Sequence, residues 1–299
     1  MKCGHPVMRN GKPGKKMSLK EILNLKFSSP VFRAILKPIF KEGKYYTILF
    51  GKLKGLKSYY RNDINYHTLM GLWETDSLDV LDKVLLCYKL TQRNIVVADV
   101  GANLGYYSLY FSKKLTRLST IFAFEPSSSI LDVLKKNMAI NNIQNVEIVE
   151  AACSDKTGEV EFYIGQNHHT SSMLDTWAEN RQTGTLTRVK AISIDEFFGE
   201  DGLGTYPDLI KMDIEGAGVF ALKGCDQCLQ IKRPIILMES HTPAEDDAVG
   251  LVLRNYQYDA FRINDQKWIL HKDRNYKDAD GVWGTMLLIP SEKKDKFKN

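Results

Sequence analysis

The sequence predicts an α/β fold with a doubly wound, mostly parallel, Rossmann-like sheet. Residues 94–100 (NIVVADV) form a short apolar run rich in β-branched residues, which is typical of a strand buried on both faces. A glycine turn and a segment with helical spacing follow directly in residues 101–115. The alternation then repeats, with a strand expected at 120–126, a helix at 127–142 and a third strand at 146–155.

The second half of the chain continues this pattern after an interruption. A polar loop at 165–185 separates two expected strands, and loops of this length are usually close to function. We expect strands at the following positions: 159–164, 187–194, 208–214, 234–240, 258–263, 267–271 and 284–290. The last three should include antiparallel strands at the edge of the sheet.

The N-terminal part of the chain differs from the rest in charge. Residues 1–60 hold fourteen Lys or Arg and two acids, a net charge of about +12, which leaves about −7 for the remainder. Such a split can mark contact with nucleic acid or an anionic surface, but a basic run is more often a solvated face. We predict a basic extension at 1–70 and the main domain at 71–299, with segment 1–60 dispensable for ligand binding.

The extension is expected to be partly helical. Residues 1–17 are polar and rich in glycine and proline, as in a flexible leader. Apolar spacing between residues 18 and 50 predicts two short helices broken at Pro30. A further helix is expected at 77–88, with Ser77 as its N-cap.

Composition and cysteine usage favour a folded protein of the cytoplasm. Hydrophobic residues make up 43% and charged residues 26%, enough apolar content for a substantial core. The chain lacks an apolar run long enough to span a bilayer, and its start lacks the apolar core of a signal peptide. Its five cysteines are scattered and odd in number, which favours reduced thiols.

The residues that follow each expected strand indicate the ligand. Gly101 and Gly105 permit a tight turn, but GANLG is not the GxGxxG that holds a dinucleotide pyrophosphate. Asp99 heads the turn, and a carboxylate suits the ammonium group of S-adenosylmethionine better than a pyrophosphate. Glu125 ends the second strand, where an acid in this fold accepts hydrogen bonds from ribose hydroxyls. Ser154 and Asp155, at the end of the third expected strand, are assigned to the same cofactor site.

The chain resembles the FkbM-type methyltransferases. The resemblance covers residues 71–290 and rests on these segments, in matching order: GLWE at 71–74, DVGANLGYYSL at 99–109, FEP at 124–126, SDKTGEVEFY at 154–163, SIDEF at 193–197, PDLIKMDIEGA at 207–217 and PIILMESH at 234–241. It implies a class I methyltransferase fold with a seven-stranded, mostly parallel sheet and helices on both faces. It also implies O-methylation in glycan or natural-product biosynthesis, with cofactor contacts at the following residues: Asp99, Gly101, Asn103, Gly105 and Glu125.

The chain departs from the family pattern after the fourth parallel strand. The family usually continues EGxE, whereas this chain has Glu215, Gly216, Ala217 and Gly218. The second acid is therefore missing, and the role of that position in substrate or ion binding is in doubt here. The pair of Asp213 and Glu215 remains.

Methylation of a hydroxyl benefits from a group that takes its proton. His241 follows the strand at 234–240, and an unperturbed imidazole is largely neutral at cytoplasmic pH, so we predict His241 as the general base. Asp213 is its competitor, from the end of the adjacent strand. Glu239 could orient the histidine, and Glu239, Glu215 and Glu74 are predicted to contact the substrate, a small molecule or glycan.

Other interpretations stay open. Asp213, Glu215, Glu239 and His241 could converge on Mg²⁺ or Mn²⁺, but no spacing establishes that geometry, and a metal is not predicted. Neither the lone CxxC of Cys225 and Cys228 nor the adjacent histidines at 168 and 169 predict zinc. The basic segment allows a nucleic-acid methyltransferase, although DIEG stands where base-amine methyltransferases typically have an NPP-type turn. A non-catalytic partner protein on the same fold is the third possibility.

Overall fold

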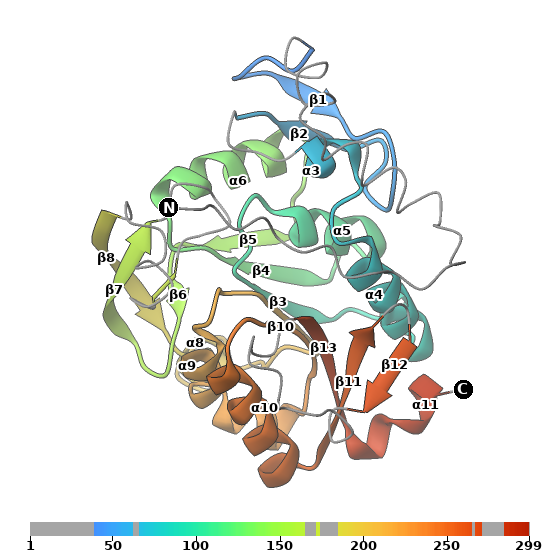
Figure 1. The fold of residues 1–299 in the computed structure, drawn as a ribbon, viewed down its shortest axis with the longest axis vertical. Coiled ribbons are helices and arrows are strands. Elements are labelled where there is room, and N and C mark those ends of the chain that lie inside the picture. Colours follow the sequence, from blue (N-terminus) through green and yellow to red (C-terminus); the bar gives the residue numbers. More distant parts are fainter. Residues whose placement is uncertain are drawn as a thin grey trace, which may run out of the picture. The chain divides into compact units, whose positions relative to one another are not determined.

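A central sheet of eight strands organises the computed structural model, which describes residues 39–61, 66–164, 172–173, 185–264, 267–270 and 284–298. The strands of this sheet are β3 (Val96–Val100), β4 (Thr120–Phe124), β5 (Val146–Val149), β9 (Leu209–Met212), β10 (Ile235–Ser240), β11 (Tyr258–Asn264), β12 (Lys267–Leu270) and β13 (Gly284–Pro290). Their order is β12-β11-β13-β10-β9-β3-β4-β5 (Figure 1). The expected seven-stranded, mostly parallel sheet is confirmed, and β12 extends its edge as an eighth strand.

The directions of the strands indicate at which edge of the sheet a ligand would bind. β5, β4, β3, β9 and β10 are linked in parallel, whereas β13 runs antiparallel between β10 and β11. The order reverses at β3, because the chain first moves outward to β4 and β5 and then returns to β9 on the other side. Ligands of open α/β sheets bind beyond the carboxyl ends of the strands at such a switch point.

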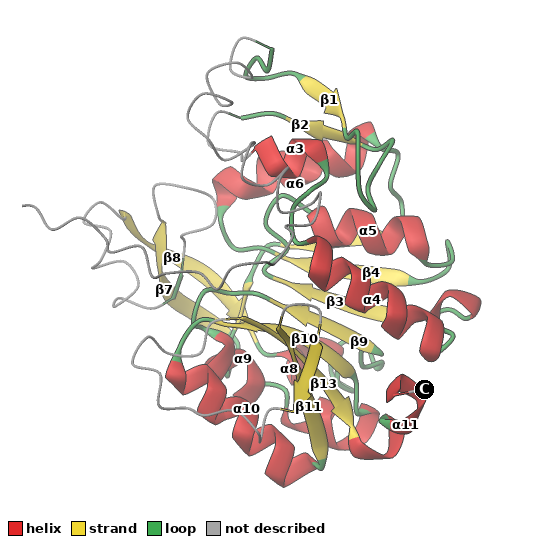
Figure 2. Ribbon diagram, turned by 45° about the vertical axis from the view of Figure 1, so that its right-hand side comes forward, coloured by secondary structure: helices red, strands yellow, loops and turns green. Residues whose placement is uncertain are grey.

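Helices cover both faces of the sheet (Figure 2). One face carries α4 (Thr75–Cys87), α5 (Tyr106–Lys114) and α6 (Ser128–Ile140), and the other carries α8 (Ile194–Phe198), α9 (Gly218–Lys223) and α10 (Pro243–Tyr256). The shorter elements are α3 (Tyr66–Met70), α11 (Asp295–Lys298), the 3₁₀ turns Leu90–Gln92 and Ser291–Lys293, and a π turn at Cys228–Lys232. Within the described ranges, no helix has both the length and the apolarity needed to cross a membrane.

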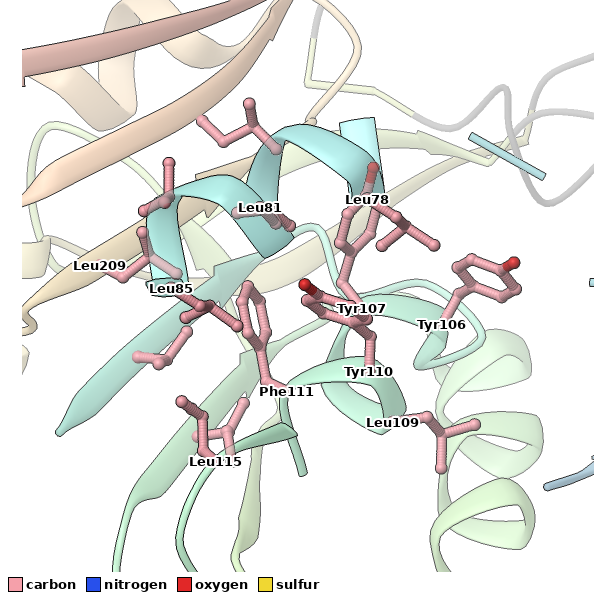
Figure 3. Packing of buried hydrophobic residues seen from close by; sticks show 14 of the residues in the cluster. Leu78, Leu81, Leu85, Tyr106, Tyr107, Leu109, Tyr110, Phe111, Leu115 and Leu209 are labelled. Atoms are coloured by element: carbon pink, nitrogen blue, oxygen red, sulfur yellow. The ribbon is translucent and has the colours of Figure 1, made fainter. Parts of the chain in front are cut away.

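The sheet has a hydrophobic core on each face, because successive side chains along a strand point to opposite faces. Val97 and Leu209 face the core under α4 and α5, whereas their neighbours Ala98 and Ile210 face the core under α8, α9 and α10. On the first face, Leu81 and Leu85 of α4 pack beside the aromatic rings of α5, including the fully buried Phe111 (Figure 3). Each such side chain stabilises the fold by about 1.5–3 kcal/mol through burial.

The expected helix at 77–88 is confirmed as α4, but its predicted cap is wrong. The N-cap is Glu74, which has a left-handed backbone (φ 44°) and makes no capping hydrogen bond with its side chain. Ser77 lies inside the first turn, where its hydroxyl meets that of Thr285 at 3.4 Å. The helix therefore begins about one turn earlier than its sequence suggests.

The third expected strand is also divided. A tight turn, closed by the Ala151 N–H and the Val149 carbonyl at 2.9 Å, separates β5 from β6 (Ala152–Cys153). β6 leaves the central sheet and pairs with β8 (Thr185–Ile192), which also pairs with β7 (Gly158–Ile164). A single strand at 146–155 is thus wrong, because its two halves belong to different sheets.

The described residues from Glu42 onward belong with the main domain. Contacts divide the chain into the units Met1–Lys41 and Glu42–Asn299. In the second unit, β1 (Tyr45–Thr47) and β2 (Lys57–Tyr59) form a hairpin, and Asn137 and Asn141 of α6 accept hydrogen bonds from its backbone.

This compact unit thus reaches further toward the N-terminus than residue 70. The expected leader at 1–17 lies outside the described residues. So does most of the region in which two helices are expected, and its end at 45–47 is a strand.

Candidate active site

A cavity opens at the carboxyl ends of β3, β4 and β9, which is where open α/β sheets bind their ligands. Five of the predicted site residues line it: Gly101, Asn103, Glu125, Asp213 and Glu215. The walls also include apolar side chains: Phe124, Ile130, Phe162, Met173 and Ile214. Phe162 comes from β7, so the small second sheet supplies part of one wall.

The turn after β3 is shaped by glycine. Gly101 has φ +78°, and a Cβ there would lie 2.1 Å from the carbonyl oxygen of Asp213. Only glycine lets this turn lie against the turn after β9. Gly105 (φ +84°) serves packing instead, because a Cβ there would lie 2.5 Å from the Leu134 side chain of α6.

Glu125 is held by the backbone. The N–H of Asn103 donates to one carboxylate oxygen at 3.0 Å, and the N–H of Ser127 donates to the other at 2.9 Å. Burial nevertheless raises the pKa of Glu125 to about 7. Each oxygen keeps a second lone pair, so this carboxylate fits the acceptor role expected toward the two ribose hydroxyls of adenosine.

The rest of the cofactor prediction divides between the cavity and its surroundings. Ser154 is buried and its hydroxyl lies 3.2 Å from Asp155, but the cavity wall is formed by the preceding residue, Cys153. Asp99 does not line the cavity either. It is fully buried, accepts a hydrogen bond from the Ser108 hydroxyl at 2.6 Å, and faces the side of the sheet that α5 covers.

Lys211 is a functional candidate that the sequence analysis missed. It is the register partner of Asp99 on the neighbouring strand, is 4% exposed, and its Nζ lies 3.4 Å from Asp213. Burial lowers its pKa, but the carboxylates of Asp213, Asp99 and Glu74 outweigh burial and raise the pKa overall. The detectable signal was a charged residue inside the apolar run LIKM.

Asp213 and His241 form a hydrogen-bonded pair at the edge of the cavity. The imidazole Nε2 lies 2.9 Å from Asp213 Oδ1, and Nδ1 lies 3.8 Å from a carboxylate oxygen of Glu215. Burial lowers the pKa of His241, but the Asp213 hydrogen bond and the surrounding carboxylates raise it to about 9. His241 is therefore protonated at neutral pH, which differs from the neutral imidazole expected from its ordinary pKa.

Two further acids approach this pair. Glu239, at the end of β10, has its pKa raised to about 8 by burial and by the charges of Asp213 and Glu74. Glu74, at the start of α4, accepts a hydrogen bond from the Tyr107 hydroxyl, and burial raises its pKa as well. The structure thus brings together the predicted acceptor-side residues Asp213, Glu239, His241 and Glu74.

The acid that is missing at position 218 has a structural counterpart. A Cβ on Gly218 would lie 2.7 Å from Oε1 of Glu245, a residue of α10. Oε1 accepts the Gly218 N–H at 3.0 Å, and Oε2 accepts the His241 N–H at 2.7 Å. Glu245 was also missed by the sequence analysis, although T-P-A-E at 242–245 is a capping box, and it fixes the backbone of His241.

Comparison with known proteins points to one family. The model of the methyltransferase FkbM domain matches residues 99–265. Methyltransferase sdnD of Sordaria araneosa is 29% identical over 169 residues, which cover 47% of this chain and 65% of that protein. Hexuronic acid methyltransferase AglP of Haloferax volcanii is 26% identical over 172 residues, 58% of this chain and 66% of that protein. Methyltransferase 1 of Beauveria bassiana is 25% identical over 153 residues, which cover 44% of this chain and 58% of that protein. The chain thus spans less than two thirds of the length of each of these relatives.

Among solved structures, methyltransferase FkbM from Methylobacillus flagellatus KT is 15% identical with a TM-score of 0.41. That match covers 76% of this chain and 55% of the other.

Proposed function

The chain belongs to the FkbM methyltransferase family, and we propose that it transfers a methyl group from S-adenosylmethionine to a hydroxyl of a sugar, glycan or natural-product acceptor. One observation carries the proposal: Glu125, whose carboxylate is fixed by two backbone N–H groups, lines the same cavity as Asp213, which is hydrogen-bonded to His241. The name of the Haloferax volcanii relative, a hexuronic acid methyltransferase, supports a sugar acceptor.

The cofactor side of the cavity suits an adenosine. Glu125 would accept hydrogen bonds from the ribose, while Phe124, Ile130 and Phe162 offer apolar contact to a flat base. The turn at Gly101 and Asn103 would bring the backbone close to this ligand, and the carboxylate of Glu215 in the same cavity would suit the positive charge of the methionine part. When bound, S-adenosylmethionine would supply the methyl group from its sulfonium.

On the acceptor side, the chain has to align a hydroxyl and remove its proton. Alignment alone contributes about 7–11 kcal/mol to such reactions, and removal of a proton contributes about 10² to 10⁴ in rate. We assign alignment to Asp213 and His241 together and acceptance of the proton to Asp213, because His241 already carries a proton at neutral pH. Glu74, Glu215 and Glu239 lie around the acceptor. Glu245 and Lys211 position this pair, because they hold the His241 backbone and the second oxygen of Asp213.

The proposal is tested by finding the acceptor. Purified protein is incubated with methyl-labelled S-adenosylmethionine and fractionated extracts of its native cell, and the labelled product is identified by mass spectrometry. We expect a labelled sugar-containing or natural-product hydroxyl, with no label in a His241→Ala control that still binds S-adenosylhomocysteine. Label in nucleic acid that decreases as the salt concentration is raised would favour the nucleic-acid alternative, because salt weakens contacts with phosphates. Absence of cofactor binding by calorimetry would favour a non-catalytic partner protein.

A further inference from the structure

Three potential ligands of different chemistry converge beside the cofactor cavity. One atom each of Asp213, Glu239 and His241 lie within 4.8 Å of one another, at the carboxyl ends of the adjacent strands β9 and β10. We infer that these residues bind a divalent cation of the Mn²⁺ or Mg²⁺ type, which holds the oxygen of the acceptor hydroxyl. The role of this ion in the reaction rests on the function proposed above, whereas its binding does not.

The spacing of the first two ligands fits one ion. His241 Nε2 and Asp213 Oδ1 are 2.9 Å apart. Two neighbouring ligands of an octahedral ion, each bound at about 2.1 Å, are about 3 Å apart. The distance between these two atoms therefore already matches the distance between two adjacent ligands of one ion. On binding, the ion would replace the proton that they share, and this proton would leave to solvent.

The surroundings of His241 also suit metal binding. When one imidazole nitrogen binds a metal, the other usually donates to a carboxylate or carbonyl, which fixes the ring. Here Nδ1 lies 3.8 Å from Glu215, while Nε2 faces Asp213. The Glu245 carboxylate fixes the same residue through its backbone N–H at 2.7 Å.

Glu239 supplies an independent observation. Its carboxylate makes no hydrogen bond to any residue within the described ranges, although it lies largely inside the protein beside Asp213. A carboxylate in such a position is costly unless a cation or donor pairs with it. Lys211 acts on this carboxylate through its charge, but the ammonium group makes its hydrogen bond to Asp213 Oδ2, at 3.4 Å, and not to Glu239.

The charge around the triad leaves room for a dication. Among the described residues, the two cations Lys211 and His241 face five carboxylates: Glu74, Asp99, Asp213, Glu215 and Glu239. A bound dication would stabilise the ionised forms of these acids.

The ion would also resolve how the acceptor proton leaves. A hydroxyl whose oxygen is coordinated by the ion has a lowered pKa and can release its proton to water. Three protein ligands leave further positions open on an octahedral ion. The site therefore favours an acceptor with a second oxygen beside the methylated hydroxyl, a vicinal hydroxyl or a carboxylate, that chelates the same ion.

Direct measurement of Mn²⁺ binding tests the inference. Full-length protein is freed of metal with chelator, and Mn²⁺ is titrated at pH 7.5 by calorimetry and by electron paramagnetic resonance. We expect one site per chain, with Glu239→Gln and His241→Ala weakening it at least about tenfold, since even outer partners of a metal matter that much. Glu125→Gln is the matched control: it removes a buried carboxylate from the same cavity but should leave the Mn²⁺ affinity unchanged.

Each outcome separates the two proposals. The melting temperature establishes that each variant is folded. Glu239→Gln should keep its affinity for S-adenosylhomocysteine, whereas Glu125→Gln should bind it more weakly. The metal site would be overturned if the wild type bound no Mn²⁺, or if the Glu239 and His241 variants bound Mn²⁺ as tightly as the wild type does. Methyl transfer at the full rate in chelator would overturn the role of the ion but leave the methyltransferase proposal standing. A Mn²⁺ site in a protein that methylates no acceptor would overturn the methyltransferase proposal but leave the metal site standing.

Discussion

The two halves of the candidate site, the cofactor cavity and the charged acceptor cluster beside it, are built by different means. In the cofactor half, a single carboxylate, Glu125, is fixed by two backbone N–H groups from residues close to it in the fold. In the acceptor half, charged side chains from α4, β9 and β10 fix one another, as in the contact of His241 with Asp213. The first half therefore depends on backbone shape, and the second depends on a balance of buried charge.

The two halves meet at one point of close approach. Gly101, in the cofactor turn, lies against the backbone of Asp213, which belongs to the acceptor half. A change at this point should disturb both halves, whereas changes on either side should affect one function and spare the other.

The largest effect is expected from Gly101→Ala. The new Cβ would lie 2.1 Å from the Asp213 carbonyl oxygen in a backbone with φ +78°. The left-handed conformation costs about 1–2 kcal/mol and overpacking about 1–3 kcal/mol, so we expect a loss of about 2–5 kcal/mol in unfolding free energy. Denaturant unfolding measures this loss, together with weaker binding of S-adenosylhomocysteine.

Gly204→Ala is the matched control for this variant. Gly204 has φ +64° with no atom within 4 Å of the added Cβ, so only the conformational cost of about 1–2 kcal/mol applies. Equal losses in the two variants would mean that the close approach of the two turns contributes nothing.

The next effect concerns the acceptor half alone. His241→Ala should lower kcat by about 10² or more while the affinity for S-adenosylhomocysteine stays nearly unchanged, because the imidazole acts on the transition state rather than on adenosine. Steady-state kinetics with the identified acceptor and calorimetry with the cofactor product provide the two readouts. A structural histidine would give a different result, a lower melting temperature with activity reduced only in proportion to the folded fraction.

A smaller effect is expected in the cofactor half. Glu125→Ala should weaken the binding of S-adenosylmethionine by about 1.5–3 kcal/mol, the worth of hydrogen bonds to a charged acceptor. Calorimetry measures the change. If the folded variant binds as tightly as the wild type, the assignment of Glu125 to the ribose is wrong.

The same residue predicts a pH dependence. Because the folded protein raises the pKa of Glu125 from 4.5 to about 7, its contribution to stability is present below about pH 4.5 and is lost as the pH rises through about 7. Ribose hydroxyls pair best with the ionised form, so affinity for S-adenosylhomocysteine should rise up to about tenfold per pH unit below 7 and level off above it. Glu125→Gln should remove this dependence, and an unchanged profile in that variant would assign the titration to another group.

The smallest effect is expected from the N-terminus. Deletion of residues 1–17 should leave cofactor affinity unchanged, because the cavity is formed by residues from Gly101 onward. Deletion of residues 1–60 is different, since it removes the hairpin that Asn137 and Asn141 hold against α6, and it should lower the melting temperature. Loss of cofactor binding in the shorter deletion, with the protein still folded, would contradict the predicted division of the chain.

Much of the fold could be predicted because buried parallel strands have a local signature. The runs at 94–100, 120–126, 208–214 and 234–240 all became strands of the central sheet, and residues at or just beyond the ends of the first three line the cavity. The prediction for 146–155 failed because an apolar run does not reveal a turn that sends its second half to another sheet. Asp99 ended a strand as expected, but the alternation of side chains directs it under α5 rather than into the cavity.

The sequence by itself determined the alternation of strands and helices, the glycine turn after β3 and the acids at the strand ends, because these depend on residues that are neighbours in the chain. Only the tertiary structure decided the state of the acceptor half. The register of β3 against β9 places Lys211 opposite Asp99, the packing of α4 brings in Glu74, and α10 delivers Glu245 to the backbone of His241. The protonation of His241 follows from the summed field of these groups at short range inside a poorly solvated site, and that field depends on distances between residues far apart in the chain.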